Sequence, residues 1–213
     1  MSYNVIGDIA GNFLSLQALL QKMPKGKPIS IGDMCDRGPR SKEVIEFFMN
    51  NGRAIMGNHD HMMISSYRGD GYYEPGIWYY NGGFETDNSF GGRVPDKIID
   101  WVETLPKFLV LENCLISHAF VNPRFTSVEQ ACDLDYSAYT QQGEDSIIWN
   151  RSKPCFRAEY SLQIAGHNSN FGIRWFSEPQ VGTFAVGIDS SKQKFLSGIH
   201  LPSMKIYQQE LID

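Results

Sequence analysis

A stretch near the start of the chain combines two carboxylates, an arginine and flanking glycines: Gly32-Asp33-Met34-Cys35-Asp36-Arg37-Gly38. Aspartate oxygens bind divalent metal ions or accept hydrogen bonds. An arginine offers a fork of donors that matches the oxygens of a phosphate group, and glycines let the backbone approach a ligand closely. The same residue types also form solvated turns, so the stretch alone leaves a simple turn as an alternative.

Similar polar residues follow other short apolar runs that predict strands. Carboxylate, amide and imidazole ligands together suit divalent ions such as Mn²⁺, Fe²⁺ or Zn²⁺. Two such ions, about 3.5–4 Å apart, can clamp a phosphate and activate a water molecule. The candidate residues at predicted strand ends are Asp8, Asp33, Asp36, Arg37, Asn58, His59, His118, Arg151 and His167.

The elements that must position these residues alternate between strands and helices in the first third of the chain. Strands are expected at residues 3–7, 29–31 and 54–56. Helical spacing of apolar residues predicts helices at 13–23, after an N-cap at Ser41, and through 62–64. This alternation favours a layered α/β architecture in which the polar loops gather at the carboxyl ends of the strands.

The rest of the chain is less regular. Residues 67–92 hold seven glycines and many aromatic residues, for which a packed irregular segment is favoured over a wall that faces substrate. A helix is expected at 95–104, and paired strands at 108–111 and 114–117. The signal from 121 to 142 is weak. Further strands are expected at 162–165, 183–188, 195–200 and 205–209.

Composition limits the class of protein. A chain of 213 residues suits one α/β domain spanning 1–213, and a net charge of -5 with 19 lysines and arginines argues against a general nucleic-acid binder. We see neither a signal peptide nor an apolar stretch that could span a membrane. The four cysteines are scattered, so we expect reduced thiols in a cytoplasmic protein.

Five motifs, in order along the chain, resemble those of the metallophosphoesterases of the PPP phosphatase superfamily. They are Gly7 to Gly11, Gly32 to Gly38, Gly57 to Asp60, His118-Ala119 and Gly166-His167. Residues 57–64, 81–83 and 148–151 and the short length look most like the bacteriophage-lambda type and related bacterial Ser/Thr/Tyr protein phosphatases. Residues 36–41 also resemble the symmetrical dinucleoside-tetraphosphate hydrolases. The resemblance implies a four-layer α/β sandwich of two mixed sheets with helices outside, the calcineurin-like fold.

The resemblance also implies a role for each candidate residue. Arg37 and Arg151 would hold phosphate oxygens, and His59 would be the general acid, oriented by Asp36. The attacking species would be a water molecule that bridges two divalent ions, with Mn²⁺ favoured and Fe, Zn or Ni as alternatives. The implied metal ligands are Asp8 for the first ion, Asp33 as the bridge, and Asn58, His118 and His167 for the second ion.

The sequence departs from the family pattern at two positions. Ala10 stands where the family has a histidine that completes the first metal site, so we expect weaker binding there and sharply reduced turnover. We favour an engineered inactivation over a natural degenerate member, since the other catalytic positions are intact. Met56 stands where the family usually has an arginine, which removes one phosphate-binding candidate. Asp189 is expected to be structural.

Three functions follow from this pattern. The first is a metal-dependent phosphatase that hydrolyses phosphomonoesters, of the phosphoprotein Ser/Thr/Tyr type. The second is a symmetrical diadenosine tetraphosphate hydrolase, which would cut a phosphoanhydride. The third is a catalytically weakened module that binds phosphate without turning it over, which Ala10 would favour.

Overall fold

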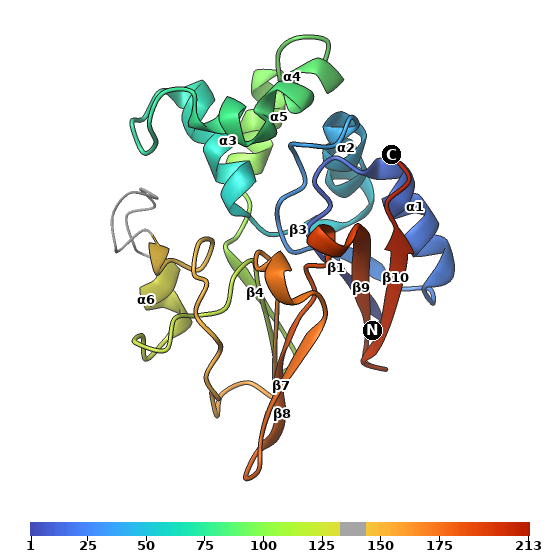
Figure 1. Ribbon diagram of the computed structural model, residues 1–213, viewed down its shortest axis with the longest axis vertical. Helices are drawn as coiled ribbons and strands as arrows, with labels where there is room; N and C mark the ends of the chain where they lie inside the picture. Colours follow the sequence, from blue (N-terminus) through green and yellow to red (C-terminus); the bar gives the residue numbers. More distant parts are fainter. Residues whose placement is uncertain (133–143) are drawn as a thin grey trace.

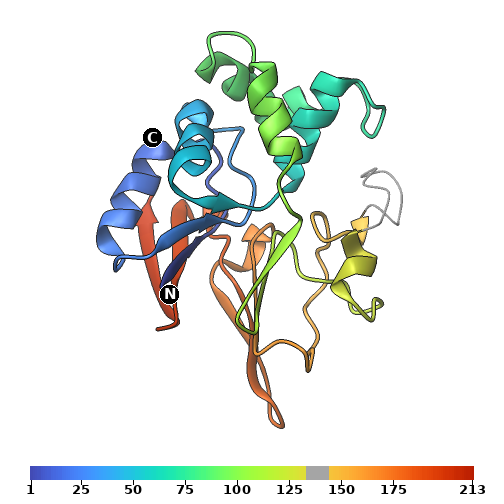
Figure 2. The same ribbon diagram turned by 180° about the vertical axis from the view of Figure 1, so that it is seen from behind.

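The computed structural model describes residues 1–132 and 144–213. Two five-stranded sheets face each other, and helices cover their outer sides (Figure 1, Figure 2). The expected α/β sandwich of two mixed sheets is therefore confirmed.

The first sheet has the strand order β10-β9-β1-β2-β3. Strand β1 runs parallel to β2, which runs parallel to β3, whereas β9 is antiparallel to both β1 and β10. The strands are β1 (Tyr3–Ile6), β2 (Lys27–Ser30), β3 (Arg53–Ala54), β9 (Phe195–Leu201) and β10 (Lys205–Glu210).

The second sheet has the order β4-β5-β6-β8-β7. Its three central strands, β5, β6 and β8, are parallel, and the two edge strands are antiparallel to their neighbours. The strands are β4 (Phe108–Leu111), β5 (Cys114–Ser117), β6 (Leu162–Ala165), β7 (Arg174–Glu178) and β8 (Gly182–Gly187).

Helices α1 and α2 pack against the first sheet, and α6 lies beside the second, while α3, α4 and α5 gather at one end of the sandwich (Figure 1, Figure 2). In the described residues no helix is both long enough and apolar enough to cross a bilayer. The helices are α1 (Phe13–Lys22), α2 (Ser41–Asn51), α3 (Asn58–Arg68), η1 (Tyr79–Gly83, a π-helix), α4 (Phe84–Ser89), α5 (Asp96–Glu103), α6 (Val128–Cys132), η2 (Ser169–Phe171) and η3 (Ser191–Gln193).

Apolar side chains from both sheets form the core between them. Val5 and Ile29 of the first sheet belong to one buried cluster with Ile116, Ile164 and Val186 of the second. Burial of such aliphatic side chains is worth about 1.5–3 kcal/mol each. This shared core holds the two sets of strand ends at fixed positions relative to each other.

Two expectations about local structure were wrong. Ser41 is the first residue of α2 and not its N-cap, because its hydroxyl is used elsewhere: it accepts the backbone N–H of Asp36 at 3.2 Å. The segment 67–92 is packed, with Tyr73 and Trp78 buried, but it is not irregular, since it contains η1 and α4.

The sequence pattern does not predict strand β7, because this edge strand has several exposed residues and no buried apolar run.

Candidate metal centre

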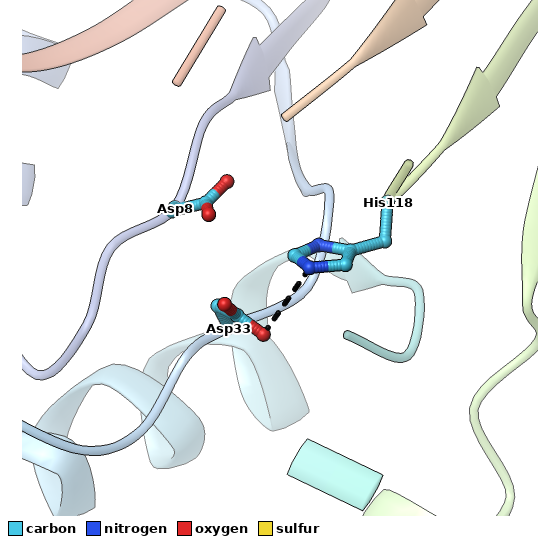
Figure 3. A group of neighbouring side chains, drawn as sticks. All are labelled: Asp8, Asp33 and His118. Atoms are coloured by element: carbon cyan, nitrogen blue, oxygen red, sulfur yellow. Dashed lines mark ion pairs between the residues drawn. The ribbon is translucent and has the colours of Figure 1, made fainter. Parts of the chain in front are cut away.

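The loops that follow β1, β2 and β5 deliver three side chains to one small space. Asp8 follows β1, Asp33 follows β2 and His118 follows β5, and one ligand atom from each lies within 4.8 Å of those of the other two. Figure 3 shows the two carboxylates and the imidazole converging, with the ion pair between Asp33 and His118 dashed. The expected gathering of polar residues at strand ends is therefore observed for these three.

Backbone contacts between the loops fix the position of the carboxylates. The N–H of Ala10 donates to the carbonyl of Asp33 at 2.8 Å, and the N–H of Gly38 donates to the carbonyl of Ala10 at 2.9 Å. A Cβ on Gly11 would lie only 2.5 Å from the carbonyl oxygen of Gly38. These glycines therefore let one loop pack against the other, whereas the sequence suggested an approach to ligand.

His118 presents a lone pair to two oxygen atoms. Its Nδ1 donates to the carbonyl of Ile31 at 2.9 Å, which leaves Nε2 as the unprotonated nitrogen of the neutral ring. Nε2 lies 2.9 Å from Oδ1 of Asn58 and 3.4 Å from Oδ1 of Asp33. This set of nitrogen and oxygen donor atoms in a buried space fits a divalent metal ion.

His167 is oriented in the same way. Its Nε2 donates to the carbonyl of Trp149 at 3.0 Å, so Nδ1 keeps its lone pair. Its backbone N–H lies 3.2 Å from both carboxylate oxygens of Asp8, and its ring centroid lies 5.1 Å from that of His118. Burial, together with the neighbouring His118 and the charge of Arg151, holds the pKa of His167 well below its usual value, so the ring is neutral and able to bind a metal.

The carboxylates also fit a bound cation. Burial raises the pKa of Asp8 well above its usual value, and the charges of Asp189 and Asp33 add to this. For Asp33, burial acts in the same direction, but the electrostatic interactions with the neighbouring imidazoles of His118 and His59 lower its pKa overall. A cation at this position would relieve the repulsion between Asp8 and Asp33.

His59 forms a buried pair with Asp36. Its Nδ1 donates to Oδ2 of Asp36 at 2.6 Å, and the guanidinium of Arg37 lies 2.8 Å from its Nε2. Since an arginine can only donate, Nε2 is the acceptor in this arrangement. The backbone N–H of His59 donates to Oδ1 of Asp33 at 3.0 Å, which ties this pair to the metal-ligand cluster.

Arg151 lies apart from Arg37. It is exposed, and together with Lys153 and Arg174 it lines a small pocket that borders Gly166. Arg37 and Lys192 line a different pocket, of about 380 Å³, which borders Ala10. The structure thus places the two predicted phosphate-binding arginines in separate pockets, both next to loops that carry candidate metal ligands.

Ala10 and Asp189 lie beside the candidate metal ligands. Ala10 offers no donor atom, and its backbone lies in the left-handed region with φ 48°. The carboxylate of Asp189 accepts the N–H and the hydroxyl of Ser191, at 3.0 and 2.8 Å, which agrees with a structural role. Among the described residues, Asp8, Asp33 and His118 are the group of His, Cys, Asp or Glu side chains whose ligand atoms lie close enough together to hold a metal ion.

Sequence reasoning gave no role to three residues that hold the site together. Asp60 is fully buried and accepts the backbone N–H groups of Asp33, Met34 and Gly57. It is the third residue of α3, from which its side chain accepts the N–H of the N-cap residue Gly57. Trp78 and Thr86 both donate to Asp36, and no local pattern announces them.

Known phosphoesterases resemble the chain in sequence. The family described as calcineurin-like phosphoesterase matches residues 1–188. A symmetrical bis(5'-nucleosyl)-tetraphosphatase of Janthinobacterium sp. (strain Marseille) is 29% identical over 171 residues, which cover 71% of this chain and 60% of that protein. Serine/threonine-protein phosphatase 2 of Escherichia coli (strain K12) is 28% identical over 167 residues, which cover 74% of this chain and 70% of that protein.

The fold is similar to that of solved phosphatases. A cold-active protein-tyrosine phosphatase of a psychrophilic Shewanella sp. superposes with a TM-score of 0.64 and 16% identity, covering 97% of this chain and 77% of that chain. At this identity the likeness shows the fold alone. The chain spans about 60% of the length of the tetraphosphatase described above.

Proposed function

Because the chain belongs to the calcineurin-like phosphoesterase family, we propose that it is a metal-dependent hydrolase that splits symmetrical dinucleoside tetraphosphates. The observation that carries this proposal is that basic side chains lie beside two of the candidate metal-ligand loops: Arg37 and Lys192 line a pocket that borders Ala10, and Arg151 and Lys153 lie next to Gly166. A phosphomonoester needs one such group of basic side chains, whereas a polyphosphate continues past the reacting phosphorus on both sides. The resemblance to a symmetrical tetraphosphatase supports the same substrate class.

The donor atoms support two neighbouring cation sites. Asp8 and Asp33 would hold a first ion, and Asp33, Asn58, His118 and His167 a second. When bound, such ions polarise the phosphoryl group and lower the pKa of a water molecule. We propose Mn²⁺ as the physiological metal, with Fe, Zn or Ni as alternatives, and reduced occupancy of the first site because Ala10 offers no ligand.

The chain's own residues would then bind substrate and move one proton. Arg37 and Arg151 would bind phosphate oxygens and stabilise the charge that develops in the transition state. When the bond from phosphorus to the leaving oxygen breaks, His59 would donate the proton on Nε2 to that oxygen. Asp36, bonded to Nδ1 at 2.6 Å, would keep the imidazole in the required orientation.

A phosphomonoesterase that acts on phosphoproteins is the second candidate. It is supported by the serine/threonine phosphatase of Escherichia coli, of which the alignment covers 70%, a larger share than for the tetraphosphatase. A phosphate-binding module without turnover is the third candidate, and the missing ligand at Ala10 supports it. We also infer a cytoplasmic location from the four free cysteines, and a net charge of -5 makes a general nucleic-acid partner unsuitable.

Product analysis separates the three candidates. The purified chain and its Ala10→His variant are incubated with Mn²⁺ and either diadenosine tetraphosphate or a phosphopeptide, and His59→Asn serves as the impaired control. Formation of two ADP molecules from each tetraphosphate, faster than release of phosphate from the peptide, supports the proposal. Faster release from the peptide would favour the second candidate. Substrate binding without product in either background would favour the third.

A further inference from the structure

The segment from Trp78 to Thr86 reaches across to the buried pair formed by Asp36 and His59. We infer that Trp78 and Thr86 are positioning residues: they orient the carboxylate of Asp36 so that His59 is aimed at the leaving oxygen. The inference rests on the proposed function, in which His59 is the general acid. It gives a role to a segment that the sequence marked only as rich in glycine and aromatic residues.

The carboxylate of Asp36 is fully buried and receives three donors. Nε1 of Trp78 lies 2.9 Å from Oδ1 and 3.1 Å from Oδ2, and the hydroxyl of Thr86 lies 2.7 Å from Oδ1. Nδ1 of His59 donates a hydrogen bond to Oδ2. A buried carboxylate is costly unless its oxygens are satisfied, and here two of the three donors come from this one segment.

Thr86 forms hydrogen bonds with both the backbone and the side chain of Asp36. Its Oγ1 accepts the backbone N–H of Asp36 at 2.8 Å while its hydroxyl proton points to the carboxylate of the same residue. Ser41 lies 3.2 Å from this hydroxyl and also accepts the N–H of Asp36. With backbone and side chain both fixed, the carboxylate has one orientation, in which Oδ2 faces His59.

Trp78 is itself immobilised by its packing. Its side chain is 1% exposed, and its ring lies against those of Tyr67 and Tyr79, with centroids 5.6 and 4.9 Å away. A Cβ on Gly83 would lie 2.5 Å from the indole ring, so only glycine leaves room for Trp78 there. The donor N–H therefore has a fixed position and not merely an available one.

The same segment also supports the backbone at Asp36 and Arg37. Both residues have positive φ, 72° and 64°, which is unfavourable for residues with a side chain. The N–H of Arg37 donates to the carbonyl of Gly82 at 3.3 Å, and a Cβ on Gly82 would lie 2.9 Å from that nitrogen. The strained turn that carries the acid pair is thus held by residues 82 and 86 from outside it.

The test removes each donor while keeping its shape. Trp78→Phe deletes the indole N–H but retains an aromatic ring in the core, and Thr86→Val deletes the hydroxyl at nearly constant volume. Thr86→Ser restores the hydroxyl as the conservative rescue. Tyr79→Phe is the matched control, because it removes a hydrogen bond from the same segment that goes to Asp87 and not to Asp36.

Hydrolysis is measured with p-nitrophenyl phosphate, whose leaving group needs little protonation, and with phenyl phosphate, whose leaving group depends on the acid. General acids typically contribute about 10²–10⁴-fold to rate. We therefore expect Trp78→Phe and Thr86→Val to lower kcat on phenyl phosphate by about tenfold or more, and on the nitrophenyl ester by less than about threefold. Thr86→Ser and Tyr79→Phe should behave as the parent chain. All variants are made in the parent and in the Ala10→His background.

A second readout does not need turnover. The Nδ1 proton of His59, bonded to Asp36 at 2.6 Å, should give a low-field proton NMR signal in the metal-free protein. The signal should shift in Trp78→Phe and stay in place in Tyr79→Phe. If the parent is active and the variants that lack a donor lose kcat by the same factor on both esters, the positioning role alone is overturned. The same conclusion follows if the NMR signal of these variants does not move. A parent and an Ala10→His variant that are inactive on diadenosine tetraphosphate as well as on both esters would instead overturn the proposed function. If Trp78→Phe does not fold, the comparison of Thr86→Val with Thr86→Ser decides whether the positioning role holds.

Discussion

Replacing Asp60 by asparagine tests how the two metal-ligand loops are held. Oδ2 of Asp60 accepts the N–H groups of Asp33 and Gly57 at 2.8 and 2.9 Å, and Oδ1 accepts that of Met34 at 3.2 Å. The thiol of Cys35 also points to Oδ1, at 3.6 Å. Every neighbour of this carboxylate is a donor, and an asparagine can accept through only one of its two terminal atoms.

The magnitude follows from these contacts. In Asp60→Asn the amide oxygen can keep the pair on Oδ2, but its NH₂ group then faces the N–H of Met34. The loss of one hydrogen bond to a charged group is worth about 1.5–3 kcal/mol, and a buried N–H left without an acceptor adds about 1–3 kcal/mol. We therefore expect a loss of about 3–5 kcal/mol in the free energy of unfolding. For a chain of this size the melting temperature should fall by roughly 10 °C.

The assay is urea unfolding at pH 8, together with calorimetric titration of Mn²⁺. Burial, together with the charge of Asp33, raises the pKa of Asp60 to about 7, so the carboxylate is ionised at pH 8. Mn²⁺ affinity should fall as well, because Asp60 positions the backbone of Asp33, the proposed bridging ligand. The control is Asp100→Asn, which removes an exposed carboxylate paired with Arg68 and should cost less than about 0.5 kcal/mol.

A loss below about 1 kcal/mol in Asp60→Asn would refute this reasoning, since it would mean that the N–H of Met34 finds another acceptor at no cost. A large loss in the exposed control would refute it as well, because the effect would then follow from charge alone and not from the buried contacts.

The remaining predictions concern the site itself. Ala10→His should raise the number of Mn²⁺ ions bound per chain and increase turnover of p-nitrophenyl phosphate by at least about tenfold, since ligand-supporting groups are worth 10–100-fold; equal binding in both chains would contradict this. His59→Asn should leave Mn²⁺ binding nearly intact but lower turnover, most for poor leaving groups; equal loss for all leaving groups would count against His59 as the acid. Burial works to lower the pKa of His59, but the charge of Asp33 and the hydrogen bond to Asp36 raise it overall. Activity that needs the protonated ring should therefore persist above the ordinary histidine pKa of about 6.5 and be lost as pH rises further, and Asp36→Asn should move this loss to lower pH. Gly82→Ala, at φ 107°, should destabilise the fold by about 1–3 kcal/mol in urea unfolding.

The convergence of Asp8, Asp33 and His118 could be predicted because it follows from the strands. Asp8 and Asp33 lie two and three residues after the ends of β1 and β2, which are parallel neighbours, so both residues lie at the same edge of the sheet. His118 follows β5 of the opposite sheet, and the shared core between the sheets brings it within reach. The alternation of short apolar runs and polar residues therefore indicates which residues lie at strand ends.

The support around the acid pair could not be predicted, because it depends on contacts between distant residues. Trp78 and Thr86 lie 42 and 50 residues after Asp36, in a segment without helical or strand periodicity. Ser41 was assigned to a helix cap by its type, but tertiary contacts with Asp36 use its hydroxyl instead. Propensity describes what a residue can do alone, and these three act through partners that the sequence does not identify.

The hydrogen bond between Arg37 and His59 is incompatible with the protonated, acid form of His59. Nε2 of His59 can accept from the guanidinium, 2.8 Å away, only while it carries no proton, yet it must carry one to act as an acid. The two conditions exclude each other. An incoming phosphate that draws the guanidinium toward its own oxygens would free Nε2 of His59 for protonation. The bound anion would thereby convert His59 into its acid form, whereas a site without phosphate would keep His59 unprotonated at Nε2.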